Sequence, residues 1–505
     1  MIELHGSSSA ANPDGVGVKV LGVLSGGALN LHGEVAGPTW TQMAATANVG
    51  ATSITLKESV AWAVGDEIII ASSDYDWEQT EEVTITAVAG NTVTFTPALT
   101  YMHYAAIEHG MDLRTEVGHL TRNILIRGAG DSDAQAFGAH VMALAGFTEV
   151  KIEGVEVTKA GQAGVMGRYP IHFHMVGDAA GQAYVKDCGI HHNFQRSITI
   201  PATHNLLVER NVLYHTKGHS LFLEDGIETG NQLLHNLVVT AIEAAPGELL
   251  LDSDEDATLI WITNPNNVIV GNAAVGADRH CLWFAMPEHP LGPSFDANIW
   301  PRFTRLGQFD HNRAHSCGSR ALMIDDGAAV NTGTEGYNWR PRTTDDSSGD
   351  PVVAVMNGLV LYRAGDRCIW TRGTHMEFHG SFFADAAIGT TFATNGGLCA
   401  VRNSIYIGET GNMGTPKQYT PVSSFDGRTL PKPWDADHLI SGWDYYDGPN
   451  GVENARFYNF RPNSQRSSAA ISMLRQDQFS LTPSNFAHDV QLMVGGDRMV
   501  HLAEH

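Results

Sequence analysis

The 505-residue sequence has few cysteines, few charged residues and no long apolar run. No stretch approaches the roughly 18 consecutive apolar residues that a transmembrane helix needs, so the sequence excludes one. Charged residues make up 17% of the chain and hydrophobic residues 43%. That balance excludes a disordered polyanion, and a chain of this length can bury a large core.

The five cysteines stand at wide, irregular spacings and form no CxxC pattern. An odd number of such cysteines argues against a disulfide framework and against a zinc or redox motif. We therefore expect buried, reduced thiols. Residues 1–6 lack the basic start and apolar stretch of a signal peptide, and we expect the chain to be a fragment whose leader is missing.

The charge is strongly negative, with 31 Lys+Arg against 55 Asp+Glu and a formal net charge of -24. This balance argues against binding to nucleic acid or to anionic membrane surfaces. Lysine is scarce, with 8 residues, whereas histidine is abundant, with 24. A local groove lined by arginine and histidine therefore remains compatible with the global acidity.

Short β-branched runs replace helical periodicity along the chain, as at residues 66–70, 82–86 and 123–126. Gly, Asn and Asp separate these runs, which indicates an all-β protein. Several segments also share one register. Counted from the first residue of each segment as position zero, a turn is followed by a small residue at position nine and by apolar residues at positions ten and twelve. A spacing of 22 to 25 residues between neighbouring segments predicts a parallel β-helix, since a β-sandwich would not keep one register so long. Cys188 and Asn211 are 23 residues apart, and Asn211 and the matching Asn236 are 25 apart, whereas longer gaps, such as Asn236 to Asn272, carry loops that project from one face. Position zero of the segments is Cys188, Asn211, Asn272, Asn312 and Leu359.

Strand alternation sends positions eleven and thirteen outward, which places Phe222, Trp283, Trp370, Glu224 and Asp325 on the outer face. Position eight holds Arg or His in successive rungs, with a gap at Ala244, so these side chains form a basic column along the β-helix. We expect this column to face solvent as a ladder of positive charges. Alternatively, these side chains cap corners and bind loop carbonyls. Arginine beside aromatic rings suits an extended carboxylated polysaccharide. The basic column consists of Arg196, His219, His280, Arg320 and Arg367.

Two histidines share one predicted strand, in which Ile171 and Phe173 point inward and His172 and His174 point outward. They could share a metal ion, act as acid/base and orienting group, or be structural. Their position predicts that His192 and His215, which occupy position four of adjacent rungs, lie in the same neighbourhood. The carboxylate nearest in register is Glu224, about 10 Å from His174 if the rungs stack regularly. Asp225 follows the strand and either turns toward a sugar or cation or caps the turn.

The stretch from Arg168 to Asp178, RYPIHFHMVGD, carries a resemblance to a known family. It closely resembles the animal cell-migration-inducing hyaluronidase and transmembrane protein 2 family, with kinship to fibrocystin-like proteins. Further motifs follow in the family's order, and these are residues 111–118, 218–226, 261–267, 272–274, 314–316, 324–325 and 446–449.

The resemblance implies a secreted or cell-surface right-handed parallel β-helix, preceded by a G8-like β region that lacks its opening strands. It further implies hyaluronan binding and calcium-dependent depolymerisation. The family's extra cysteines and animal-type insertions are absent, which suggests a microbial relative whose polymer need not be hyaluronan. We divide the chain into a G8-like region (1–120), a β-helix core (121–412) and C-terminal rungs with a cap (413–505).

These patterns lead to one main hypothesis, an extracellular, endo-acting glycoside hydrolase of hyaluronan-like, uronate-containing polymers. A polysaccharide lyase and a non-catalytic glycan-binding adhesin are the alternatives. Calcium is expected from the resemblance, and a transition metal at the histidine cluster is a second possibility. We assign catalysis to His172, His174, His219, Glu224 and Asp225, substrate binding to Arg168, Arg196, Phe222, His280, Trp283, Arg320, Asp325, Arg367 and Trp370, and a metal site to His172, His174 and Asp225.

Overall fold

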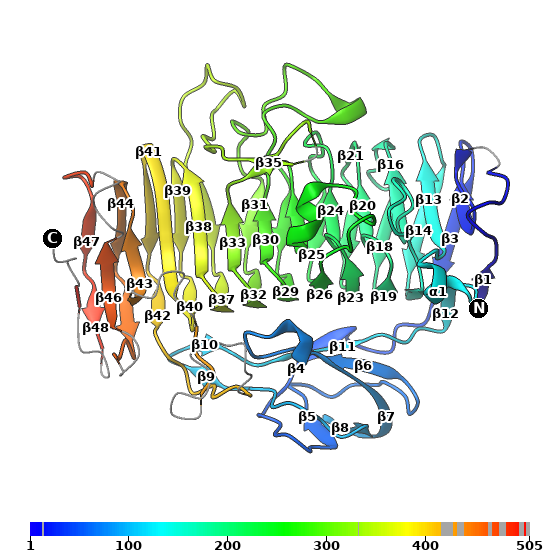
Figure 1. The fold of residues 1–505 in the computed structure, drawn as a ribbon, viewed down its shortest axis with the longest axis horizontal. Coiled ribbons are helices and arrows are strands. Elements are labelled where there is room, and N and C mark those ends of the chain that lie inside the picture. The colour runs from blue at the N-terminus through cyan, green and yellow to red at the C-terminus, as the bar shows by residue number, and fades with distance from the viewer. Residues whose placement is uncertain are drawn as a thin grey trace.

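The computed structural model consists almost entirely of β-strands stacked along its long axis (Figure 1). It describes residues 1–12, 15–331, 333–415, 428–431, 439–462, 467–473, 481–493 and 499–500. The stacked strands pair in parallel, which confirms the prediction of an all-β parallel β-helix. The described helices are single turns, α1 (Ser132–Gln135), η2 (Trp77–Gln79), η3 (Asp252–Asp256) and η4 (Gly292–Ser294). In this part of the chain no helix is long and apolar enough to cross a membrane.

The β-helix has three faces, and each rung contributes a strand to each. The first face is one 13-stranded sheet, and the other two alternate within a 23-stranded sheet in which β41 (Ile388–Arg402) runs through both. The first face comprises β1 (Ile2–Leu4), β12 (Ile124–Gly128), β15 (Val155–Thr158), β19 (Gly189–Asn193), β23 (Val212–Lys217), β26 (Leu237–Ile242), β29 (Ala273–Ala277), β32 (Arg313–Cys317), β37 (Val360–Ala364), β40 (Phe382–Ala384), β42 (Ile405–Ile407), β45 (Arg456–Tyr458) and β48 (Gln491–Leu492). The second face comprises β2 (Val20–Val23), β13 (His140–Leu144), β16 (Ile171–His174), β20 (Ile198–Ile200), β24 (Leu221–Leu223), β27 (Thr258–Ile262), β30 (His280–Phe284), β33 (Arg320–Ile324), β38 (Arg367–Gly373), β43 (Ile440–Tyr445) and β46 (Ser468–Met473). The third face comprises β3 (Ala28–His32), β14 (Glu149–Glu153), β18 (Ala183–Lys186), β22 (Leu207–Glu209), β25 (Gln232–Leu234), β28 (Val268–Val270), β31 (Gln308–Asp310), β36 (Ala354–Asn357), β39 (Met376–His379), β44 (Gly448–Glu453) and β47 (Phe486–His488).

An asparagine ladder explains the repeat register. The backbone N–H of Asn211 donates to Oδ1 of Asn236 at 3.0 Å, that of Asn236 to Asn272 at 2.9 Å, and that of Asn272 to Asn312 at 3.0 Å. Each side-chain amide also donates to a main-chain carbonyl, as Asn236 Nδ2 does to Val208. Stacked asparagines thereby satisfy buried main-chain groups at each corner, which rewards the same residue at the same place in successive rungs.

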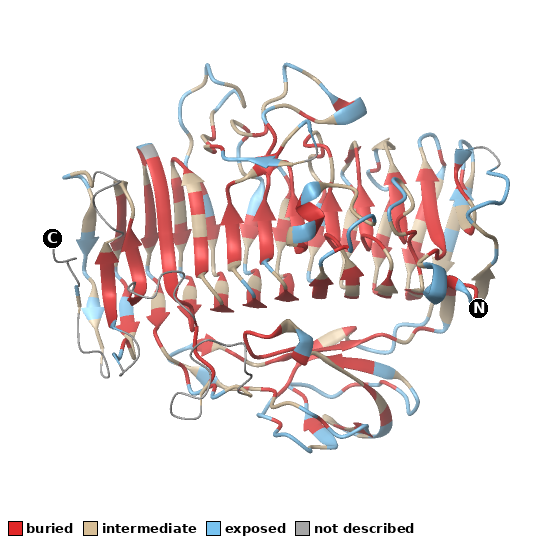
Figure 2. Cartoon of the chain, in the orientation of Figure 1, coloured by how far each residue is buried: buried red, intermediate tan, exposed pale blue. Residues whose placement is uncertain are grey.

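The apolar pairs at positions ten and twelve form the core of the β-helix. Ile198, Leu221, Leu282, Leu322 and Ile369 all belong to one continuous buried cluster. Figure 2 shows these buried segments along the stacked strands, with exposed residues concentrated on loops. The β-helix therefore encloses a packed interior, and a ligand can reach only its outer faces.

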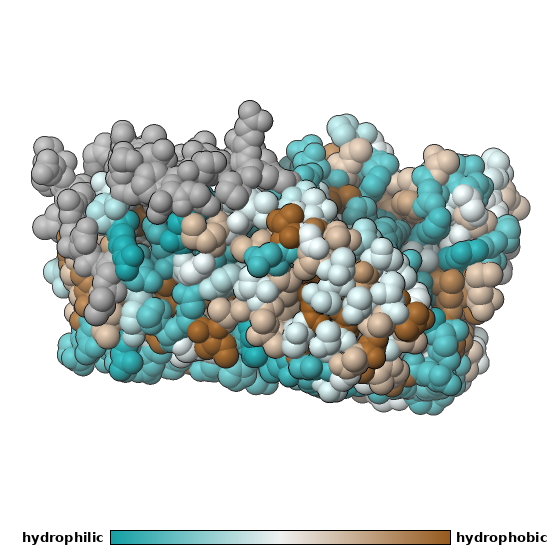
Figure 3. Space-filling model, turned by 90° about the horizontal axis from the view of Figure 1, so that it is seen from below, coloured by the Kyte–Doolittle hydropathy of each residue, from teal (hydrophilic) through white to brown (hydrophobic). Residues whose placement is uncertain are grey.

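A separate β-domain packs against the first face of the β-helix (Figure 1). Its sheet has the order β4 (Trp40–Gln42), β11 (Glu116–His119), β6 (Glu67–Ile70), β7 (Glu81–Ala89), β8 (Thr92–Thr96), β5 (Ser53–Thr55), and β9 (Ile107–Glu108) pairs with β10 (Met111–Asp112). The predicted G8-like region, residues 1–120, starts too early. Strands β1, β2 and β3 pair with β12, β13 and β14, so they form the first rung of the β-helix. The surface on the β-domain side intermixes polar and apolar residues (Figure 3).

Short paired elements also lie outside the main sheets. β17 (Gly177–Asp178) pairs with β21 (Thr203–His204), and β34 (Gly327–Ala328) pairs with β35 (Thr334–Glu335).

One cysteine prediction is wrong. Cys281 and Cys317 form a disulfide across a corner of the β-helix, with Cα atoms 5.8 Å apart. The odd number of cysteines and their irregular spacing concealed this pair, because the two cysteines are 36 positions apart and a long loop lies between them. The other three cysteines, Cys188, Cys368 and Cys399, are buried free thiols as expected.

Candidate active site

A cavity of about 340 Å³ opens on the outer side of the second face. Strand β16, the segment before it and the residues directly after β24 line one part of the cavity, and residues that follow β26, β30 and β33 line the rest. The residues lining it are mostly apolar, with a small group of polar side chains, a pattern typical of ligand sites. The cavity is lined by Met166, Gly167, Tyr169, His172, His174, Met175, Pro201, Glu224, Asp225, Leu251, Ser253, Leu291, Gly292, Pro293, Ala328, Ala329, Val330 and Gly333.

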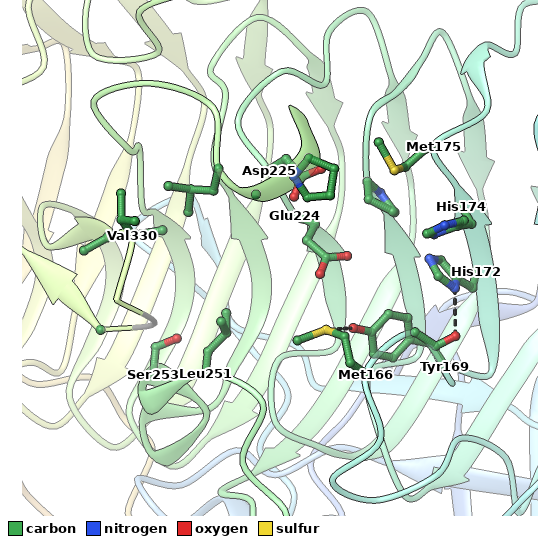
Figure 4. Close-up of a pocket in the computed structure, with 18 residues that line it drawn as sticks. Met166, Tyr169, His172, His174, Met175, Glu224, Asp225, Leu251, Ser253 and Val330 are labelled. Atoms are coloured by element: carbon green, nitrogen blue, oxygen red, sulfur yellow. Dashed lines mark hydrogen bonds between the residues drawn. The ribbon is translucent and has the colours of Figure 1, made fainter. Parts of the chain in front are cut away.

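The histidine pair lies at one side of this cavity, as strand alternation predicts (Figure 4). Ile171 and Phe173 enter the core, while the rings of His172 and His174 meet edge to face with centroids 5.0 Å apart. Nδ1 of His172 lies 2.9 Å from the carbonyl oxygen of Gly167 and donates to it. Burial, followed by the proximity of His174, lowers the pKa of His172 to about 3. His172 is therefore neutral near pH 7 and cannot serve as a proton donor in its cationic form.

Glu224 directly follows β24 and points into the cavity toward the side that holds Tyr169 (Figure 4). Burial raises the pKa of its carboxyl to about 8, and Asp225 and Glu228 reinforce the shift, while Arg196 opposes it. At neutral pH the carboxyl is therefore mostly protonated. A carboxylic acid held protonated beside a cavity is suited to donate a proton to a leaving group.

A second carboxyl adjoins Glu224. Oδ2 of Asp225 accepts a hydrogen bond from the Ser294 hydroxyl at 2.6 Å, and burial raises the pKa of Asp225. Behind it, Glu228 accepts from the backbone N–H groups of Ala202, Asp225 and Gly226 at 2.7–3.0 Å. Burial raises the pKa of Glu228 to about 7, with Asp225 adding to the shift. The turn that the sequence suggested at Asp225 is thus held by Glu228, a residue that pattern reasoning missed.

The predicted metal site is not assembled. In the part of the chain that the structure describes, no group of three or more His, Cys, Asp or Glu side chains is placed to hold a metal ion. Calcium prefers oxygen ligands, whereas His172 and His174 offer nitrogen and Asp225 is bound by Ser294. These residues do not fit a calcium ion, and a requirement for calcium or for a transition metal stays a prediction.

The basic column has the predicted register but not the predicted exposure. His280 pairs with Arg320, and Arg320 with Arg367, while Thr258 rather than Ala244 fills the intervening rung. Arg320 is half-buried, whereas His280 and Arg367 are 4% and 6% exposed. The prediction of a solvent-facing positive ladder is therefore wrong.

The loop after β26 is the reason that the column is covered. It brings Asp254, on η3, onto Arg196, whose Nη2 donates to Oδ1 at 2.9 Å, and both side chains are completely buried. His219 lies beneath the same loop, with Nε2 3.1 Å from the Ser253 hydroxyl. Burial lowers the pKa of His219 to about 3. Neither Arg196 nor His219 lines the cavity, so the structure does not place them at the predicted catalytic or binding surface.

The aromatic side chains that the sequence predicted on the outer face are also covered by loops. Phe222 and Trp283 are buried with Trp261 in an outer cluster beneath Leu251 and Leu291. Trp370 is half-buried, with the guanidinium groups of three arginines 5.2–5.9 Å from its ring centre. Asp325 accepts from Nε1 of Trp370 and Nε of Arg372, both at 2.9 Å. Phe222, Trp283, Asp325 and Trp370 lie outside the cavity lining, and their roles in binding stay predictions.

His192 and His215 lie elsewhere than predicted. Their ring centroids are 5.4 Å apart on the first face, and Nε2 of His192 is 3.2 Å from the Glu82 carboxylate of the β-domain. His192 belongs to β19 and His215 to β23, which are strands of the first face, whereas β16 belongs to the second face. They therefore belong to the contact between the β-domain and the β-helix.

The sequence is similar to known proteins over most of its length. Residues 136–322 match the family described as CEMIP beta-helix. The chain is 37% identical to fibrocystin-L from Mus musculus over 75% of this chain and 10% of that protein. It is 31% identical to the cell surface hyaluronidase CEMIP2 of Homo sapiens, over 85% of this chain and 36% of that one. A third relative, cell migration-inducing and hyaluronan-binding protein of Mus musculus, is 30% identical over 87% of this chain and 37% of its own length. The chain thus spans between a tenth and somewhat over a third of these relatives.

Proposed function

Because the chain carries the CEMIP β-helix and resembles hyaluronidases along most of its length, we propose that it is a carbohydrate-active enzyme, an endo-acting glycoside hydrolase of hyaluronan-like, uronate-containing polymers. The observation that carries the proposal is Glu224, a carboxyl kept protonated in a cavity that also holds Asp225. The names of the relatives support a secreted or cell-surface location, and so does the disulfide, which is typical of oxidising compartments.

In the proposed reaction, Glu224 gives its proton to the glycosidic oxygen as the bond from that oxygen to the anomeric carbon breaks. Asp225 accepts a proton from the water that attacks the same carbon, so one water molecule is consumed for each bond cut. Ser294 holds Asp225 in place, and Glu228 fixes the turn that carries both carboxyls. His172, neutral and bonded to Gly167, contributes a fixed polar wall.

The cavity favours hydrolysis over the lyase alternative. A lyase that removes the proton beside a uronate carboxylate needs a cation to neutralise that carboxylate. Among the described residues that line the cavity there is no Lys or Arg, and Arg196 is buried in its pair with Asp254. A product assay separates the two reactions, since a lyase yields an unsaturated product that absorbs near-ultraviolet light, whereas a hydrolase yields only reducing ends.

The decisive test is a product assay on a panel of uronate polymers, with and without a chelator. New reducing ends without unsaturated product support the proposal. Retardation of the polymer on a gel without any shortening, with metals supplied, would leave only the adhesin. The chelator arm tests the calcium prediction separately, and His174→Ala tests the histidine side, since unchanged cleavage by that variant would discard a role for it.

Arg168 gives one prediction about the acidic sugar. It adjoins the cavity and donates to backbone carbonyls, at 2.9 Å to Gly15 and 3.4 Å to Gly167, and among the described residues it forms no ion pair. Because Arg168 is not among the residues that line the cavity, we propose that it binds the carboxylate of a uronate outside the cavity, next to the sugar that is cleaved. Arg168→Gln is expected to raise KM for a uronate polymer about tenfold, the cost of a charge-assisted hydrogen bond, with kcat nearly unchanged.

The matched control for Arg168 is Arg127→Gln, which removes an arginine paired with Glu3 on the first face. Initial rates across polymer concentration at low and moderate salt measure the effect, which should shrink as salt screens the charge. Equal KM values for the two variants would remove Arg168 from the binding surface.

A further inference from the structure

Tyr169 is a buried phenol at the edge of the cavity that the repeat pattern did not single out. It precedes β16, lines the cavity, and its ring meets that of His172 edge to face at 4.9 Å. Figure 4 shows its hydroxyl on the side of the cavity toward which Glu224 points. The phenol therefore borders the cavity that a sugar at Glu224 would occupy, with Met166 against its hydroxyl.

A buried ion pair holds this phenol. Nη1 of Arg196 lies 3.3 Å from the Tyr169 hydroxyl, while its Nη2 reaches both carboxylate oxygens of Asp254 at 2.9 and 3.2 Å. The guanidinium also lies 4.1 Å from the ring centre of Phe222. With a carboxylate on one side and an aromatic ring against its face, the guanidinium has a single arrangement available.

Asp254 extends this arrangement to the cavity wall. Its Oδ2 accepts from the backbone N–H groups of Leu250 and Leu251, each at 2.9 Å. Leu251 and Ser253 line the cavity opposite Tyr169 (Figure 4). The pair thus fixes both a wall of the cavity and the phenol that faces it.

The hydrogen of the Tyr169 hydroxyl is not used by a strong acceptor. An arginine has no acceptor atom, so the phenol oxygen accepts from Arg196 and must donate elsewhere. The hydroxyl's contact in that direction is Sδ of Met166, at 3.2 Å, and a thioether is a weak acceptor. Met166 is 55% exposed at the cavity mouth, so a ligand oxygen can replace it without disturbing the core.

We propose that Tyr169 contacts the substrate, donating its hydroxyl hydrogen to an oxygen of the sugar bound beside Glu224, and that Arg196 and Asp254 are its positioning pair. This inference rests on the proposed function. It also replaces the role predicted for Arg196, since the guanidinium acts through Tyr169 and not on a uronate.

The first test is Tyr169→Phe, which removes one oxygen and keeps the ring. We expect kcat/KM on the cleaved polymer to fall about 10²-fold, the effect of losing one donor in a cavity, and oligosaccharide binding to weaken. Tyr445→Phe is the matched control because it also removes a buried hydroxyl. Tyr445 is on β43, and its hydroxyl donates to the carbonyl oxygen of Phe486 at 2.6 Å. Thermal denaturation should show similar stability for both variants.

The second test measures how kcat/KM depends on pH in variants of the positioning pair, Arg196 and Asp254. Arg196→Lys keeps a charge against Asp254 and is expected to retain activity within about tenfold, whereas Arg196→Gln combined with Asp254→Asn keeps the site folded without charge. Arg196 lowers the pKa of Glu224 more than Asp254 raises it, so the double variant should move the basic limb of the kcat/KM profile to higher pH. Tyr169→Phe should leave that limb in place.

The outcomes separate this inference from the proposed function. Cleavage by Tyr169→Phe within threefold of the Tyr445→Phe rate overturns the role of Tyr169 and leaves the hydrolase standing. A basic limb that stays in place in the double variant overturns the role of the pair. If the wild type binds oligosaccharides without cutting them, the hydrolase fails, and the loss of affinity in Tyr169→Phe still decides whether the hydroxyl touches sugar. If it neither binds nor cuts, both ideas are overturned.

Discussion

Glu224→Gln is expected to reduce kcat/KM for polymer cleavage about 10³-fold or more. A positioned general acid contributes about 10²–10⁴-fold, and glutamine keeps the shape of the side chain without a transferable proton. Binding should change little because the wild-type carboxyl is already uncharged near neutral pH. The measurement is the rate of new reducing ends, with oligosaccharide affinity measured in parallel.

The control is Glu255→Gln. Glu255 is exposed on η3, the same short helix whose loop covers the cavity, so its change tests whether any loss of a carboxylate near the site slows the enzyme. It should cleave at the wild-type rate. Comparable cleavage by Glu224→Gln and Glu255→Gln would rule out Glu224 as the proton donor.

The pH dependence follows from the same residue. The protonated form of Glu224 is the active form, so kcat/KM should fall as pH rises through its pKa of about 8. Glu224→Asp should keep a basic limb, whereas the residual rate of Glu224→Gln should lose it. A basic limb near pH 5 in the wild type would mean that the cavity does not raise the pKa of the acid that reacts.

The rungs of the β-helix were predictable because each reuses the same local solution. An asparagine at position zero binds the next rung through its main chain and side chain, and alternation then fixes which residues enter the core. The same alternation placed His174 and Glu224 outward, and the structure brings both to one cavity. Local pattern was sufficient there because neighbouring strands are in direct register.

The covered parts of the site could not be predicted, since they depend on loops that have no fixed register. Arg196 looked like a groove residue until the loop after β26 brought Asp254 onto it. The same loop, with the loop after β30, buries Phe222 and Trp283. Tyr169 carries no repeat signal because it precedes its strand, and its partner is a residue 27 positions away in the chain.

The second large effect is expected at the contact between the two parts of the chain. Glu116 on β11 of the β-domain is completely buried, and its two oxygens reach Nε of Arg313 at 2.7 Å and Nε2 of His315 at 2.8 Å, both on β32. Burial alone would raise the pKa of Glu116, but Arg313 and then His315 hold it below its usual value. The carboxylate therefore stays charged at neutral pH and is matched by a guanidinium that is largely, but not completely, buried.

Glu116→Ala should lower the free energy of unfolding by about 3–5 kcal/mol, because it removes the carboxylate that pairs with the largely buried guanidinium of Arg313. Glu116→Ala combined with Arg313→Met should recover much of that loss, since an apolar pair needs no charge compensation. Urea denaturation followed by tryptophan fluorescence measures both variants. Glu149→Ala, at a partly exposed ion pair with Lys151, is the control and should change little.

The lowered pKa of Glu116 determines how the stabilisation by this ion pair depends on pH. Because the pKa of Glu116 is lower in the folded chain, its contribution to stability is complete above the ordinary glutamate pKa and is lost as pH falls through the folded value. The difference in stability between wild type and Glu116→Ala should therefore shrink at low pH and persist at neutral pH. A loss of under about 1 kcal/mol in Glu116→Ala at neutral pH would show that the β-domain is held by its apolar contact, where Ile69 and Leu120 pack on Val212 and Leu237, and not by the ion pair.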